Sequence, residues 1–182
     1  ENNNSNTLLP TFQSTYTFPL MRETDKFKNT LTPKFSIKLS PDYTKDIRNR
    51  DGGQIEYSNI YDLDRLGIEE ANEGGISAAY GYEFTKIDKS TLAQKMKFGF
   101  ANNLRLSENK DLPFHTNLGD KVSDFVGIFE YSSEDNFKLD YNFSLKDNLI
   151  EKNYELFGFE FYLKNLTSSF EYRNENNSKL KD

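Results

Sequence analysis

The sequence predicts an all-β protein, an antiparallel up-and-down meander of about eight strands, on the evidence of its polar and apolar alternation, its segment lengths and its connections. The alternation is clearest over residues 137–145, which run apolar, polar, apolar without exception. The apolar members are Phe137, Leu139, Tyr141, Phe143 and Leu145, and the polar members are Lys138, Asp140, Asn142 and Ser144. Because a strand points successive side chains to opposite faces, this segment has one apolar and one polar face.

Similar segments recur along the chain. We expect strands at residues 8–18, 29–39, 75–87, 91–106, 123–131, 136–146, 153–163 and 166–173. Several have eleven residues or more, whereas strands of soluble proteins most often have ~5–6. A crossing of a membrane β-barrel takes ~9–11 residues, so the lengths favour a transmembrane outer-membrane barrel.

The composition agrees with a barrel and excludes several other classes. Mean hydropathy is −0.80 although the chain has 16 Phe and 11 Tyr. In a barrel only every second strand residue meets lipid, which keeps average hydropathy low, whereas a membrane helix needs ~20 mostly apolar residues in a row. The net charge of −6, with scattered basic residues, argues against nucleic-acid binding. The absence of cysteine removes disulfides and thiolate metal sites.

The predicted connections alternate between long and short. Residues 39–75 and 106–123 form long connections and residues 146–153 a moderate one. Short turns are predicted at residues 88–90, 132–135 and 164–165. Outer-membrane barrels have short turns on the periplasmic side and longer loops outside. We therefore expect these turns on one side, the periplasmic one.

The polar face of the strands is predicted to face a barrel lumen. A Lys or Arg on the lipid face near the bilayer midplane costs ~2–4 kcal/mol, and an acidic residue somewhat less, so a slip that turned Lys138 and Asp140 toward lipid is disfavoured. The residues expected to face the lumen are Lys138, Asp140, Asn142, Ser144, Glu160, Glu171 and Arg173.

The sequence offers few candidates for catalytic residues. His115 is the only histidine and falls in a polar connection. Acidic neighbours such as Asp62 and Asp64 define no carboxylate separation of the kind that glycoside hydrolysis requires. We therefore predict no catalytic, cofactor or metal site and no enzyme activity.

An ordered set of short motifs resembles the barrel domain of the LPS-assembly protein family (LptD, formerly OstA). Residues 29–35 match a T-L-x-P-[RK] strand opening, residues 59–67 an aromatic, D-R-hydrophobic loop pattern, and residues 73–75 a small-residue strand entry. Residues 123–127, Ser-Asp-Phe-Val-Gly, and then residues 139–143 resemble the family's paired hairpin strands. The resemblance spans nearly the whole chain, including Leu9-Pro10 before the first of these motifs.

The resemblance implies a translocon in the outer membrane of a Gram-negative bacterium. Such a protein receives lipopolysaccharide from a periplasmic bridge protein and inserts it into the outer leaflet, with an LptE-like plug lipoprotein inside the barrel. A full member has a periplasmic jellyroll and many more strands, so residues 1–182 are expected to be one partial barrel without a second domain. The opening Glu-Asn-Asn-Asn-Ser-Asn, without an initiator Met, favours an internal piece.

One long connection is a candidate for contact with lipopolysaccharide. Its mixed charges suggest binding to lipid phosphates or to bridging divalent cations. The residues of this hypothesis are Arg48, Arg50, Asp62, Asp64 and Arg65.

Two other architectures fit the alternation. One is a different outer-membrane barrel, either porin-like or a complete eight-stranded barrel, since eight strands suffice to close one. The other is a soluble β-sandwich, for example a carbohydrate-binding module, with the aromatic side chains enclosed between two sheets.

Overall fold

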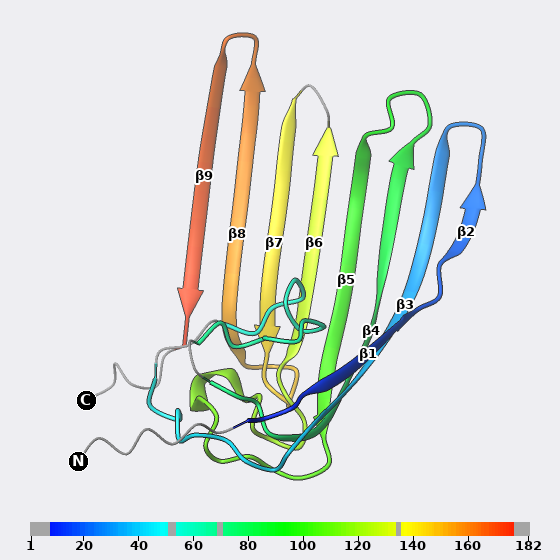
Figure 1. Ribbon diagram of the computed structural model, residues 1–182. Helices are drawn as coiled ribbons and strands as arrows, with labels where there is room; N and C mark the ends of the chain where they lie inside the picture. The colour runs from blue at the N-terminus through cyan, green and yellow to red at the C-terminus, as the bar shows by residue number, and fades with distance from the viewer. Residues whose placement is uncertain (1–7, 51–53, 69–70, 134–135, 177–182) are drawn as a thin grey trace.

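A computed structural model describes residues 8–50, 54–68, 71–133 and 136–176, and there it contains a single antiparallel sheet of nine strands (Figure 1). The strands are β1 (Phe12–Thr17), β2 (Leu20–Glu23), β3 (Phe27–Ser40), β4 (Gly75–Asp88), β5 (Gln94–Arg105), β6 (Phe125–Ser133), β7 (Phe137–Leu145), β8 (Lys152–Leu163) and β9 (Leu166–Glu175). A short 3-10 helix, η1 (Phe114–Thr116), lies between β5 and β6. None of the helical structure in the described ranges is long and apolar enough to cross a membrane.

The predicted fold class is confirmed, with one subdivision at the amino end. The predicted strand 8–18 corresponds to β1, and the additional strand β2 pairs with the other half of β3. Pro19 separates the two, because proline has no N–H to donate to the ladder. The last ladder-like bond before the break runs from Phe18 N to Pro33 O, at 3.0 Å.

The sheet order ends at β1 and β2 on one side and at β9 on the other, so the described part of the chain does not close into a barrel. A complete eight-stranded barrel is therefore not what these residues form. All nine strands belong to one sheet, and within the described ranges no second sheet packs on it. The β-sandwich expectation is also wrong for this part of the chain.

The turns and the long loops lie at opposite ends of the sheet (Figure 1). The connections β2–β3, β4–β5, β6–β7 and β8–β9 gather at one end, which we call the turn end. In the predicted turn 132–135, residues 134–135 lie outside the described residues. At the other end, the loop end, lie residues 41–74 (loop A), 106–124 (loop B) and 146–151. The alternation of long and short connections is confirmed.

The two faces of the sheet differ in what covers them. One face, here called the apolar face, carries a continuous row across eight strands: Leu20, Leu31, Phe84, Phe98, Phe129, Tyr141, Phe157 and Tyr172. The other, the loop-covered face, packs against loops A and B at the loop end. Its core joins Ile47, Ile55, Tyr57, Ile60, Leu66, Leu112 and Leu118 of the loops to Ala79, Ala101, Val126 and Ile128 of the strands. The buried core thus lies on the polar side of the strands.

Candidate functional site

The seven residues predicted to face the lumen lie on the loop-covered face. Register pairs Lys138 with Glu160, and it places Asp140 and Glu171 on either side of Gly158. The remaining three, Asn142, Ser144 and Arg173, occupy the same face through the pairs Asn142–Leu156–Arg173 and Ser144–Tyr154. The structure therefore brings all seven to one side of the sheet, and their exposure to a lumen stays a prediction.

These seven side chains have different surroundings. Ser144 is buried under loop B and donates a hydrogen bond to Asp124 Oδ2 at 2.8 Å. Toward the turn end, Lys138 Nζ lies 3.8 Å from Asp140 Oδ1, and Glu160 accepts a hydrogen bond from Tyr162 Oη. Arg173 lies over the ring of Tyr154 and pairs with Glu175 at 2.8 Å. Among the described residues, the loops cover only the loop-end part of this face.

A ladder of alternating charges crosses the same face beside the loops. Glu83 Oε2 on β4 lies 3.1 Å from Lys34 Nζ on β3 and 3.9 Å from Lys97 Nζ on β5. Lys97 Nζ also lies 3.8 Å from Glu130 Oε1 on β6, and Gln94 Nε2 donates a hydrogen bond to Glu130 Oε2 at 2.9 Å. The ladder gives a polar surface with little net charge across four strands.

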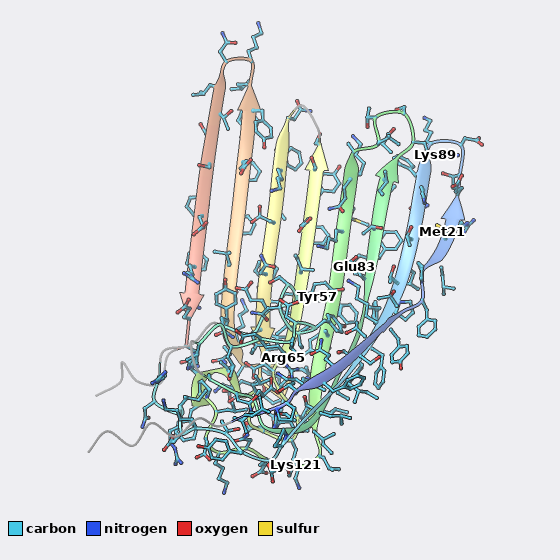
Figure 2. The ribbon with its side chains drawn as sticks, in the orientation of Figure 1. Met21, Tyr57, Arg65, Glu83, Lys89 and Lys121 are labelled. Carbon is cyan, nitrogen blue, oxygen red and sulfur yellow. The ribbon has the colours of Figure 1, made fainter. Side chains whose placement is uncertain are left out.

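Loop A is held on the sheet by a buried ion cluster, which we call the Glu73 cluster. Arg65 of loop A contacts the Glu73 carboxylate through Nη2 at 2.5 Å and Nε at 3.0 Å. Lys38 of β3 lies 3.0 Å from Glu73 Oε2, and Arg105 of β5 lies 2.7 Å from Glu73 Oε1. Figure 2 labels Arg65 at the level where loop A crosses the strands. Three cations from two strands and a loop thus share one carboxylate.

The cations of the Glu73 cluster have further partners. Arg65 Nη1 donates to Asn103 Oδ1 at 2.7 Å and Nη2 to Ser77 Oγ at 2.8 Å. Lys38 Nζ donates to the backbone oxygen of Leu63 at 2.7 Å. Burial alone would raise the pKa of Glu73, but the three neighbouring cations outweigh it and hold that pKa below its usual value. The carboxylate is therefore charged at neutral pH.

The five residues of the lipopolysaccharide hypothesis do not form one surface. The expectation for Arg65 is wrong, because its side chain is only 3% exposed and is bound within the Glu73 cluster. Arg48 instead joins the two loops, through Asp46 of loop A at 2.8 Å and Asp111 of loop B at 2.7 Å. Asp64 accepts N–H bonds from Leu66 and Gly67 in a turn, and Arg50 and Asp62 are exposed. Contact of these four with lipopolysaccharide stays a prediction.

A second buried carboxylate, Asp124, anchors loop B. It accepts hydrogen bonds from Asn117 Nδ2 at 2.6 Å, Asn153 Nδ2 at 2.7 Å and Ser144 Oγ at 2.8 Å. Burial raises the pKa of the Asp124 carboxyl, against the lowering effect of these donors. Asp124 lies in the Ser-Asp-Phe-Val-Gly segment, immediately before β6. In the sequence that segment is recognisable as a family signature, but it carries no local sign that Asp124 anchors a loop.

Loop A also packs an aromatic ring on a glycine of the sheet. A Cβ added to Gly99 would lie 2.6 Å from Tyr57 Cζ, so glycine is required for the ring to approach β5 this closely. Lys34 Nζ lies 5.4 Å from the centroid of the same ring. Figure 2 shows Tyr57 near Glu83, at the boundary between the loop-filled and open parts of this face. The side chain closes the turn-side rim of the core.

Within the described ranges, no three His, Cys, Asp or Glu side chains are arranged to hold a metal ion. His115 follows Phe114 in η1, and its backbone oxygen accepts a bond from Asn153 Nδ2 at 2.6 Å.

The fold is compatible with more than one family of outer-membrane barrel, and comparison with protein families identifies the family of this chain. The model of the family LptD, LPS transport system D, matches residues 1–182, the whole chain. The chain belongs to the LptD family. No curated protein matches it. Membership places the chain among outer-membrane proteins of Gram-negative bacteria with a role in lipopolysaccharide transport and outer-membrane assembly.

Proposed function

We propose that this chain is part of the barrel wall of an outer-membrane translocon that inserts lipopolysaccharide into the outer leaflet. In this assignment the apolar face meets lipid and the loop-covered face lines the lumen. The observation that carries the proposal is the uncovered row of apolar side chains across eight strands, opposite a face that is polar and partly filled by loops.

The height of the apolar band supports a membrane span. On β4 the apolar-face positions are apolar from Ile76 to Phe84, and Lys86 follows at the turn end. Eight residue steps of ~3.4 Å make about 27 Å along the strand, or about 21 Å along the membrane normal at a tilt of ~40°. Outer-membrane barrels carry an apolar band of ~25 Å, which is close to this height.

The open part of the loop-covered face is the part we assign to the passage and to the plug. Between the loops and the turn end it presents Lys97, Glu130, Lys138, Asp140 and Glu160. These side chains suit contact with the sugars of lipopolysaccharide or with a plug lipoprotein of the LptE kind, because both are polar partners. The periplasmic bridge protein is expected to contact other parts of the full protein.

The orientation follows from the ends of the sheet. The turn end is assigned to the periplasm and the loop end to the cell surface, as the lengths of the connections indicate. Arg48, Arg50, Asp62 and Asp64 then belong to the surface side, where lipopolysaccharide phosphates and divalent cations lie.

Single cysteines test the proposal without interference from this chain, which has none. In the full-length protein in outer membranes, F84C and F159C sample the apolar face, while E83C and E160C sample the other. We expect a water-soluble maleimide to label the second pair and a lipid-phase reagent to label the first. Equal aqueous labelling of all four would contradict the membrane assignment. Normal surface lipopolysaccharide after depletion of the protein would contradict the transport role.

A further inference from the structure

The apolar face has a shallow groove near the turn end, between β2, β3 and β4. Its volume is about 390 Å³, and its lining residues are Leu20, Arg22, Thr24, Asn29, Leu31 and Phe84. Leu20, Leu31 and Phe84 lie side by side across the three strands and form the apolar floor. Leu20 is 62% exposed and Leu31 39% exposed, so the floor is open to whatever surrounds this face.

The turn-side end of the groove is cationic. In the strand register Arg22 lies opposite Asn29, and Asn29 lies opposite Lys86. These three residues therefore lie side by side on the apolar face, two positions nearer the turn end than the apolar floor. Neighbouring strands are ~4.8 Å apart, which puts the Cα atoms of Arg22 and Lys86 roughly 10 Å from each other. Side chains of this length can converge on one anion placed above Asn29.

Neither cation is neutralised by a carboxylate in the part of the chain that the structure describes. Lys86 Nζ lies 4.0 Å from the centroid of the Phe27 ring. Among the described acidic side chains nearby, Glu23 pairs with Lys89 at 3.1 Å, Asp88 accepts bonds from Ser90 in the β4–β5 turn, and Asp25 of the β2–β3 turn forms an ion pair with neither cation. At the loop end of the same face, by contrast, Lys152 is paired with Glu155 at 2.6 Å.

We propose that this groove binds an anionic phospholipid. One acyl chain lies over Leu20, Leu31 and Phe84, and the phosphate lies between Arg22 and Lys86 with the Asn29 amide as a further donor. Arginine binds phosphate oxygens through paired N–H groups, and lysine adds a point charge. The site rests on the proposed function, since it requires the apolar face to lie in lipid and the turn end to face the periplasmic leaflet.

The test titrates the full-length protein in mild detergent with phosphatidylglycerol, and with phosphatidylcholine as the zwitterionic control, by native mass spectrometry. We expect tighter binding of phosphatidylglycerol, and about fivefold weaker binding for each of R22Q and K86Q. The variant L31W fills the groove and keeps both charges, so it should also weaken binding. The control K164Q removes a cation at the same end of the sheet, in the turn between β8 and β9 and therefore at the opposite edge from the groove, and should leave binding unchanged.

Several results would overturn the proposal. Wild-type affinity in R22Q and K86Q, or an equal loss in K164Q, would mean that no specific cation pair is involved. If inorganic phosphate alone displaces phosphatidylglycerol, the site binds phosphate and not a lipid. If lipid A binds more tightly than phosphatidylglycerol, the ligand of the groove is lipid A and not a phospholipid. Unchanged circular dichroism must accompany each variant. Failure of this site leaves the maleimide pattern on the two faces intact, which separates it from failure of the proposed function.

Discussion

The two anchors of the loops use opposite electrostatics. The Glu73 cluster surrounds one carboxylate with three cations from β3, β5 and loop A, whereas Asp124 is surrounded by neutral donors from loop B, β7 and β8. Both carboxylates are buried, yet their pKa values are shifted in opposite directions. Burial alone therefore does not set the charge state of a loop anchor, because the charge of the partners decides it.

The largest effect is expected for Glu73→Ala. It leaves Lys38, Arg65 and Arg105 buried without their shared anion, and removal of one member of a buried ion cluster costs ~3–5 kcal/mol. The free energy of unfolding in detergent and the protease sensitivity of loop A measure the change. The control Glu130→Ala removes a partly exposed carboxylate of the same face and should have a much smaller effect. Equal effects would show that the cluster does not hold the loop.

Asp124→Ala should destabilise the protein less, by ~1–3 kcal/mol, since it leaves neutral donors unsatisfied rather than bare charges. Loop B should become protease-sensitive while loop A stays protected. Asp124→Asn keeps an acceptor oxygen and is expected to retain most of the stability. If loop A is released to the same extent as loop B, the two anchors are not independent.

Lowering the pH should affect the stability of the two loop anchors in opposite directions. The pKa of Glu73 is lowered on folding, so its contribution is present above the ordinary value of 4.5 and is lost as pH falls through the folded pKa. The pKa of Asp124 is raised, so its contribution is greatest below the ordinary value of 3.8 and declines as pH rises through the folded pKa. Hydrogen-exchange protection, measured relative to the intrinsic exchange rate at each pH, should be lost in loop A before loop B as pH falls from 7 to 3, and the reverse order would contradict both assignments.

The smallest effect is expected for Arg48→Gln. Its contacts with Asp46 and Asp111 join loops A and B at an exposed position, where ion pairs contribute little. No measurable change in unfolding is expected. If Arg48 and Arg50 contact lipopolysaccharide, reversal of both charges should instead raise outer-membrane permeability to a large antibiotic. Unchanged permeability would remove that hypothesis.

The sheet could be predicted from the sequence because its signal is local. Alternation over residues 137–145 predicts β7 and its two faces without knowledge of any partner. The break between β1 and β2 also has a local signal, Pro19, which the strand prediction did not use. The lengths of the connections likewise assigned loops and turns to opposite ends of the sheet.

The candidate site was less predictable, since its contacts join distant residues. Arg65 looked like a solvated loop residue beside Asp62 and Asp64, but Glu73, Lys38 and Arg105 converge on it only when loop A folds back on the sheet. The strands, their apolar face and the family can be recognised from the sequence without any structure, because they depend on patterns between neighbours in the chain. Which loop charges are buried and which stay exposed follows only from the fold, because that depends on strands brought together from 30 or more residues away.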